Sequence, residues 1–133
     1  MRKLFLTLIV TLWGWTPLAA SPADIEATIS DQIAAFQQDD FPRAFTFASP
    51  NIQRLFGDSD RFGMMVRQGY PMVWRPADVR FLDLRTIGDM QWQKVQIRDM
   101  GGVIHILDYQ MINLDNEWRI NGVQLLPSPE VGA

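Results

Sequence analysis

The spacing of the hydrophobic residues changes near Gly69, and this change limits the chain to one class of fold. Before Gly69, apolar residues recur three and four positions apart, which is the pattern of one helix face. After it, apolar and polar residues alternate, which is the pattern of strands buried on one side. Helices followed by a run of strands predict an α+β domain, with the helices packed on a curved antiparallel sheet.

The first half of the chain predicts short helices joined by tight turns. Ser21 followed by Pro22 is a favourable start, and this first helix should end near Asp39. Similar caps at residues 40, 49 and 58 predict three more helices, the last of which stops at Gly69. The apolar stripe of the first helix consists of Ile25, Ile29, Ile33 and Phe36.

The second half predicts a short strand over residues 72–74, then longer strands over 79–87, 90–98, 103–113 and 117–126. A two-residue loop at Asp115-Asn116 places Asn113 opposite Trp118. The Gly101-Gly102 turn leaves the register of strand 90–98 open. An odd loop, with the apolar residues Val95 and Ile97 inside, is favoured over an even loop with residues 92 and 94 inside.

This register assigns residues to the two faces of the sheet. We expect His105 and Tyr109 on the inner face, beneath the helices, and Asp83 on the inner face of strand 79–87. The outer face would leave an apolar patch on a monomer, and we expect a homodimer to cover it. This patch consists of Ile104, Ile106, Ile112 and Val123.

The first 20 residues have the three parts of a secretory signal. Arg2 and Lys3 precede an apolar stretch over residues 4–15, which is shorter than the roughly 20 residues of a membrane-spanning helix. Small residues follow, so we expect Sec-type export, cleavage after Ala20 and no stable membrane anchor afterwards. The protein would then reside in the periplasm or outside the cell, as one domain over residues 21–126 with a flexible tail over 127–133.

Charge and composition exclude several classes of function. Of the 12 basic residues two precede the cleavage point, so the mature chain keeps 10 against 15 acidic residues, a net charge of −5. An acidic chain without basic clusters is not expected to bind nucleic acid or anionic membranes. The absence of cysteine excludes disulfides and thiol chemistry, and a single histidine leaves no expected metal site or cofactor.

Several segments resemble a family of small exported bacterial proteins known as domain of unknown function 4864. The order of helices and strands, ending in Trp-x-Ile, also resembles the nuclear-transport-factor-2-like fold of the SnoaL and ketosteroid isomerase type, a cone whose sheet wraps one long helix. The resemblance implies the fold and the compartment, and it implies no activity. The segments are Gln32-Ile33-Ala34-Ala35-Phe36, Asp39-Asp40, Ala44-Phe45, Ala48-Ser49-Pro50, Phe56-Gly57, Phe62, Met65-Val66, Tyr70-Pro71, Arg75-Pro76 and Trp118-Arg119-Ile120-x-Gly122.

Two functional hypotheses follow. The first is a binding or interaction module that holds a small apolar or aromatic ligand, with Tyr70 and Trp74 near the mouth of the cone and His105 and Tyr109 inside. The second is a small cofactor-independent enzyme, isomerase-, cyclase- or hydrolase-like. It would use Asp83 or His105 as a base beside Tyr109, with a pKa shifted by apolar surroundings. No Gly-x-Ser-x-Gly or other catalytic motif occurs, so binding is the leading hypothesis.

Overall fold

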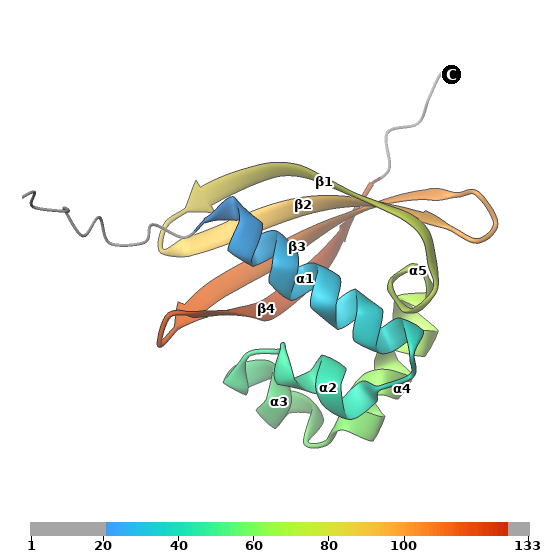
Figure 1. Ribbon diagram of the computed structural model, residues 1–133, viewed down its shortest axis with the longest axis horizontal. Coiled ribbons are helices and arrows are strands. Elements are labelled where there is room, and N and C mark those ends of the chain that lie inside the picture. Colours follow the sequence, from blue (N-terminus) through green and yellow to red (C-terminus); the bar gives the residue numbers. More distant parts are fainter. Residues whose placement is uncertain (1–20, 128–133) are drawn as a thin grey trace, which may run out of the picture.

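The computed structural model describes residues 21–127, in which five helices lead into a four-stranded antiparallel sheet (Figure 1). The α+β prediction is confirmed. The sheet order is β1-β2-β3-β4, and the expected signal peptide and nearly all of the expected tail lie outside the described residues. The elements are α1 (Pro22–Gln37), α2 (Phe41–Thr46), α3 (Pro50–Phe56), α4 (Ser59–Gly69), α5 (Pro71–Trp74), β1 (Pro76–Ile87), β2 (Met90–Asp99), β3 (Ile104–Leu114) and β4 (Glu117–Leu126).

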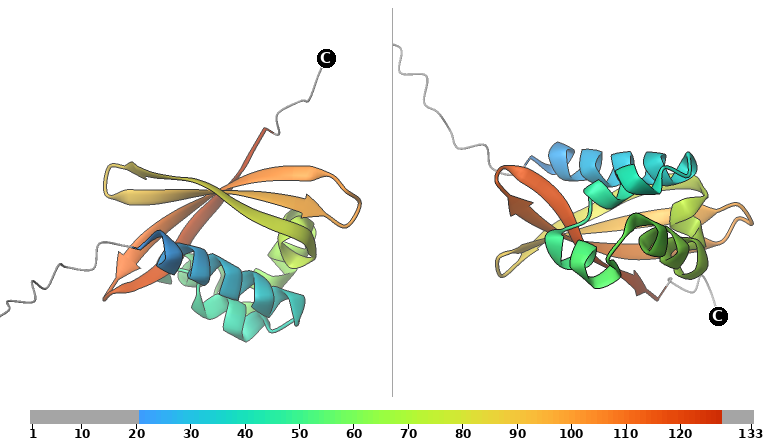
Figure 2. Two further views of the ribbon diagram at one scale, coloured as in Figure 1. Left: turned by 45° about the horizontal axis from the view of Figure 1, so that its top comes forward. Right: turned by 90° about the horizontal axis from the view of Figure 1, so that it is seen from below.

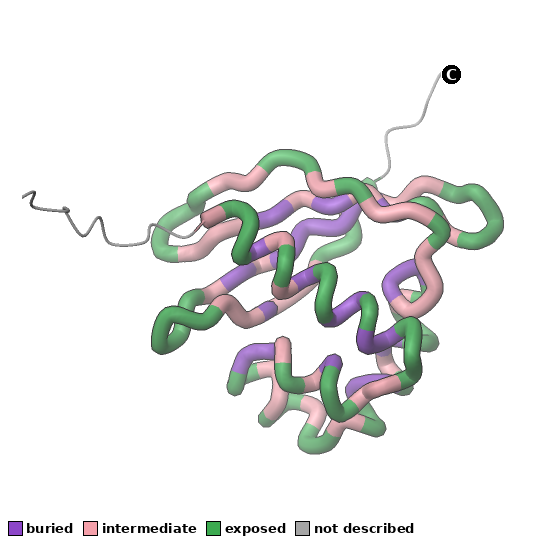
Figure 3. Tube along the Cα trace, in the orientation of Figure 1, coloured by how far each residue is buried: buried purple, intermediate pink, exposed green. Residues whose placement is uncertain are grey.

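All five helices lie on one side of the twisted sheet, and α1 runs along that side (Figures 1 and 2). Figure 3 shows buried positions on α1 and on the middle strands, which is where the core lies. The stripe predicted on α1 is buried there, with Ile25 and Ile29 fully enclosed. Within residues 21–127, no helix combines the length and the hydrophobicity needed to cross a membrane.

The predicted helix starts are confirmed by their caps. The side chain of Ser21 accepts a hydrogen bond from the amide of Ala23, and that of Ser49 from Ile52. Asp40 and Asp58 cap α2 and α4 in the same way. Each cap satisfies an amide that the helix itself leaves without a partner, so these boundaries are set by local sequence.

The predicted strand registers are confirmed where the strands are regular. Val95 and Ile97 are fully buried, and Ile97 pairs with His105, as the odd loop requires. The last hairpin pairs Asn113 with Trp118. Its loop residues Asp115 and Asn116 have φ of 51° and 66°, which suits the tight turns that join twisted strands.

Two β-bulges overturn face assignments made from strict alternation. The β1–β2 register shifts between Phe81 and Leu84, so Leu84 packs on the core and Asp83 is exposed, not inside. A second shift, in β4 opposite Gln110 and Met111, turns Val123 to the inner face. An extra residue in one strand reverses the alternation beyond it, and sequence periodicity alone does not reveal where it occurs.

The short strand predicted over residues 72–74 is wrong, because these residues form α5. Pro71 occupies the first turn, where its missing amide costs nothing, and the amide of Val73 bonds to the carbonyl of Tyr70. Met72 and Val73 are both buried, which a strand packed on one side would not allow for neighbours. Three residues are too few for alternation to separate a strand from one helical turn.

A pair of glycines in α4 gives a test of helix packing. A Cβ at Gly63 would lie 2.5 Å from Cγ of Phe41, whereas a Cβ at Gly69 would meet nothing within 4 Å. We expect Gly63→Ala to be less stable than Gly69→Ala by about 1–2 kcal/mol. Both changes gain helix propensity, but only the one at Gly63 overpacks the contact with Phe41. Urea unfolding followed by tryptophan fluorescence measures the difference. Equal stabilities would mean that the Phe41 ring is free to move.

Candidate functional site

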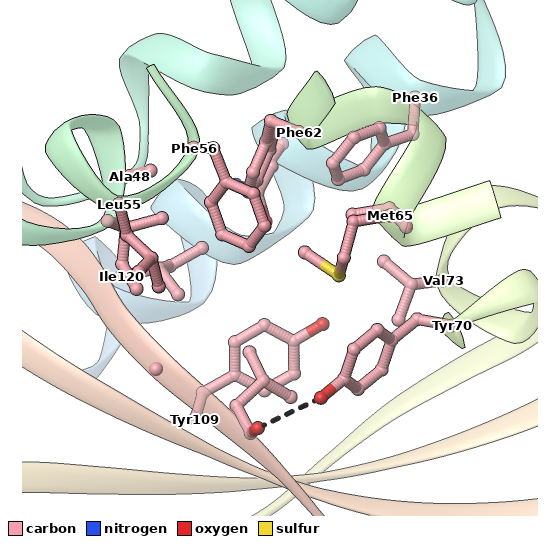
Figure 4. Close-up of a pocket in the computed structure, with 15 residues that line it drawn as sticks. Phe36, Ala48, Leu55, Phe56, Phe62, Met65, Tyr70, Val73, Tyr109 and Ile120 are labelled. Carbon is pink, nitrogen blue, oxygen red and sulfur yellow. Dashed lines mark hydrogen bonds between the residues drawn. The ribbon is translucent and has the colours of Figure 1, made fainter. Parts of the chain in front are cut away.

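A cavity of about 250 Å³ lies between the helices and the inner face of β3 and β4 (Figure 4). Its helical wall is formed mainly by α3 and α4, and Figure 4 shows Phe56 and Met65 from this wall directed toward the sheet. Tyr109 of β3 and Ile120 and Val123 of β4 contribute the opposite wall. The lining is mostly apolar, and no residue in it carries a charge at neutral pH.

The aromatic side of the cavity is centred on Phe62 of α4. Its ring centroid lies 5.3 Å from that of Phe45, 5.6 Å from Phe56 and 5.7 Å from Phe36. Rings at these separations and inclinations pack favourably. The cluster therefore joins α1, α2, α3 and α4 into one layer above the sheet.

The α2–α3 connection is bonded directly to β4. The amide of Ile120 donates to the carbonyl of Phe47 at 2.9 Å, and the amide of Ser49 donates to the carbonyl of Ile120 at 2.8 Å. The Ser49 hydroxyl also bonds to Oδ1 of Asn121 at 2.7 Å. These bonds hold α3 against the edge of the sheet, so its apolar residues form one end of the cavity.

Tyr109 is the most unusual residue in the cavity wall. Its side chain is 1% exposed, yet its hydroxyl has no hydrogen-bond partner in the described structure. Figure 4 shows this hydroxyl directed toward the helical wall. Burial, and then the neighbouring Tyr70, raise the pKa of the Tyr109 phenol above its ordinary value of 10, so the phenol is protonated at neutral pH.

Tyr70, at the junction of α4 and α5, also lines the cavity, and its hydroxyl is engaged. The phenol donates to the carbonyl of Val123 at 3.3 Å, a bond drawn in Figure 4. Tyr70 and Tyr109 are therefore brought together, as proposed for a ligand site. Trp74 and His105, the other two proposed ligand-binding residues, do not line this cavity.

Trp74 instead belongs to a polar cluster that joins the end of α1 to α5. Its Nε1 donates to Asp39 at 2.8 Å, and Arg75 donates to both oxygens of Asp39, at 3.0 and 3.1 Å. The guanidinium carbons of Arg75 and Arg67 lie 4.1 and 4.8 Å from the centre of the Trp74 ring. The hydrogen bonds from Trp74 and then Arg75 hold the pKa of Asp39 below its ordinary value. The indole is thus occupied by structural contacts.

His105 supports the β2–β3 turn. Its Nε2 lies 2.8 Å from Oδ2 of Asp99, whose Oδ1 accepts from the amides of Gly101 and Val103. The hydrogen bond with His105 is the largest cause that lowers the pKa of Asp99, and the backbone bond from Val103 is the next. Since Asp83 is exposed on β1, the structure does not bring Asp83, His105 and Tyr109 together as a catalytic group.

Gln32 is a cavity residue that the sequence analysis missed. It lies on the buried face of α1 and is 4% exposed, with Nε2 donating to the carbonyl of Ala44 at 3.2 Å. A signal was present, because Gln32 is three residues after Ile29 and four before Phe36, inside the predicted apolar stripe. Within residues 21–127, no three His, Asp or Glu side chains group to hold a metal ion.

Comparisons with known proteins address the fold and the family. The solution structure of a SEC-C motif containing protein from Rhodopseudomonas palustris matches with a TM-score of 0.55 and 19% sequence identity, over 79% of this chain and 80% of that chain. A similarity at this identity shows a shared fold alone. No curated protein matches. The model of a domain of unknown function, DUF4864, matches residues 18–133, which is most of the chain, and the protein therefore belongs to the DUF4864 family.

Proposed function

We propose that this protein is an exported binding module that holds a small apolar ligand in the cavity between α3, α4 and the sheet. The observation that carries the proposal is the buried, unpartnered hydroxyl of Tyr109 in an apolar cavity. A buried polar group without a partner costs about 1–3 kcal/mol, so it calls for an explanation. A ligand that completes the hydrogen bond provides one.

The cavity favours binding over catalysis. Acid–base catalysis needs a titratable group within hydrogen-bond reach of the substrate. The lining includes no Asp, Glu, His, Lys or Arg, and the only ionisable groups in it are the phenols of Tyr70 and Tyr109. The raised pKa of Tyr109 keeps its phenol protonated at neutral pH, so no phenolate is present to act as a base. The enzyme hypothesis, which relied on Asp83 or His105, therefore has no candidate base at this cavity.

The nuclear-transport-factor-2-like assignment is part of the proposal. The helices lie on one face of a curved antiparallel sheet, and α1, with 16 residues, is the longest helix in the described part. A sheet that curves over one long helix is the arrangement that the resemblance implied. This assignment supports a ligand site between helices and sheet, without indicating any particular ligand.

Native mass spectrometry of the protein from its own exported fraction tests the binding proposal. We expect a retained small molecule in the wild type and its loss in Met65→Trp, because Met65 lines the cavity and a larger side chain would fill it. Met64→Trp is the matched control, since Met64 is the 56% exposed neighbour on the same helix. Loss in both variants would indicate general disruption, and a wild type without bound molecule would contradict the proposal.

Export is proposed from the signal pattern. We expect N-terminal sequencing of the protein recovered outside the cytoplasm to begin at Ser21, with a mass that corresponds to residues 21–133. Ser21 also caps α1, so cleavage there would leave the described fold complete. Recovery of a chain that still begins at Met1 in the membrane fraction would instead indicate an uncleaved anchor.

The homodimer is proposed through the face of the sheet that carries no helix. Ile104 and Ile112 are half-buried on this face, whereas Ile106 is buried, at 8% exposed. Trp92 and Leu126 share the face by register, and Val123, which we expected here, is on the other side. We expect sedimentation at about 50 µM to give a dimer, a concentration suited to modest affinity, and Ile104→Asp to give a monomer.

Met100→Asp is the control for the dimer, because Met100 is 75% exposed in the adjacent turn. This variant should sediment as the wild type does. A wild type that sediments as a monomer at this concentration would remove the dimer proposal.

A further inference from the structure

We propose that the cavity selects a neutral ligand that carries a hydrogen-bond acceptor, and that the Tyr109 hydroxyl donates to this acceptor. This inference rests on the proposed binding function and specifies the chemistry of the ligand. A compact carbonyl compound, such as an aryl ketone, an ester or a lactone, fits the description.

The ligand is neutral because nothing in the cavity would compensate a charge. No described residue in the lining is ionised at neutral pH, and most of the wall consists of aliphatic and aromatic side chains. Moving a carboxylate or an ammonium group into such surroundings without a partner is strongly unfavourable. Carboxylic acids, amines and phosphates are therefore rejected in their ionised forms.

The ligand carries an acceptor because Tyr109 offers an unused donor. Burial keeps its phenol protonated, and Tyr109 lines the cavity with its oxygen buried and without a hydrogen-bond partner. A phenol can donate one hydrogen bond, and no described acceptor receives it. An acceptor on the ligand would therefore remove an existing cost, in addition to forming a new interaction.

Two other polar side chains of the cavity already donate hydrogen bonds to backbone carbonyls. The hydroxyl of Tyr70 donates to the carbonyl of Val123, and Nε2 of Gln32 donates to the carbonyl of Ala44. These bonds hold both side chains in the wall. The hydroxyl of Tyr109 is thus the one in the lining whose proton is not already donated. A ligand needs a single acceptor to receive it.

The size of the cavity limits the ligand to about one ring with a short substituent. Its volume of about 250 Å³ lies below the roughly 300–1,000 Å³ of typical ligand pockets. It exceeds the roughly 150 Å³ of an apolar cavity that accepts benzene. The 73% exposed side chain of Leu55 contributes to the lining, so one edge of the cavity reaches the surface.

Two probes of nearly the same shape test the inference. Acetophenone carries a carbonyl group where α-methylstyrene carries a C=CH₂ group, so the pair differs mainly in the acceptor. We expect the wild-type protein to bind acetophenone about tenfold more tightly in titrations followed by ¹H–¹⁵N NMR, because pairing a buried donor is worth on the order of one tenfold step in affinity. Benzoate, which is ionised at neutral pH, should not bind.

Two matched variants identify the donor. Tyr109→Phe should bind both neutral probes with the same affinity, whereas Tyr70→Phe should keep the preference for acetophenone, because the Tyr70 proton bonds to Val123. Both tyrosines line the same cavity, so loss of wall area is comparable in the two variants. Thermal unfolding is the folding control, and Tyr109→Phe should unfold at the same or a higher temperature, since the removed hydroxyl had no partner.

The outcomes separate this inference from the proposed function. If the wild type binds both neutral probes equally, the cavity binds apolar ligands but the acceptor inference is wrong. If the preference for acetophenone persists in Tyr109→Phe, or disappears in Tyr70→Phe, the assignment of Tyr109 as the donor is wrong. If the wild type binds neither neutral probe, both the inference and the small-ligand function are contradicted.

Discussion

The hydrogen bonds between Ile120 and the α2–α3 connection determine the relation of the helices to the sheet. Phe47 and Ser49 bond to the backbone of Ile120, which extends the edge of β4 by a short parallel bridge. An edge strand offers unpaired backbone groups that need partners, and here the helical half of the same chain provides them. Because Ser49 also caps α3, one residue both begins that helix and attaches it to the sheet.

This attachment leaves a space between α3, α4 and the strands beneath them. The Phe62 cluster packs the helices against each other, while Tyr109, Ile120 and Val123 form the opposite wall. Protein interiors are normally close-packed, and an apolar void loses contacts that packed side chains would make. A chain that retains a cavity of about 250 Å³ in a domain of this size gives up stability at that place, which is typical of binding sites.

Much of the fold could be predicted from the sequence because its signals are local. The caps at Ser21, Asp40, Ser49 and Asp58 act within one helical turn, and the Asp115-Asn116 hairpin is determined by its own two residues. The bulges were not predictable in this way. Gln93 donates to the carbonyl of Leu82 at the β1 bulge, and this stabilising partner is eleven residues away in the sequence.

The candidate site was less predictable than the fold, since it is assembled from distant elements. Tyr70 and Tyr109 were identified as possible ligand residues, but Trp74 and His105 find structural partners in Asp39 and Asp99 that no periodicity reveals. From the sequence alone, an aromatic or polar residue that lines the cavity cannot be distinguished from one that makes structural contacts. Only the tertiary contacts separate those that line the cavity from those that stabilise a turn or a helix end.

Tyr109 and Gln93 show most clearly why the site is not ordinary core. The two residues pair across β2 and β3 on the inner face, and both are about 1% exposed. Gln93 donates to the carbonyls of Leu82 and Lys94, as buried polar groups normally do. Among residues 21–127, the other buried side-chain oxygen without a hydrogen-bond partner is Oδ1 of Asp108, and that carboxylate is paired with Arg85. Tyr109 therefore differs from both, since its hydroxyl makes no hydrogen bond and its side chain lines an apolar cavity.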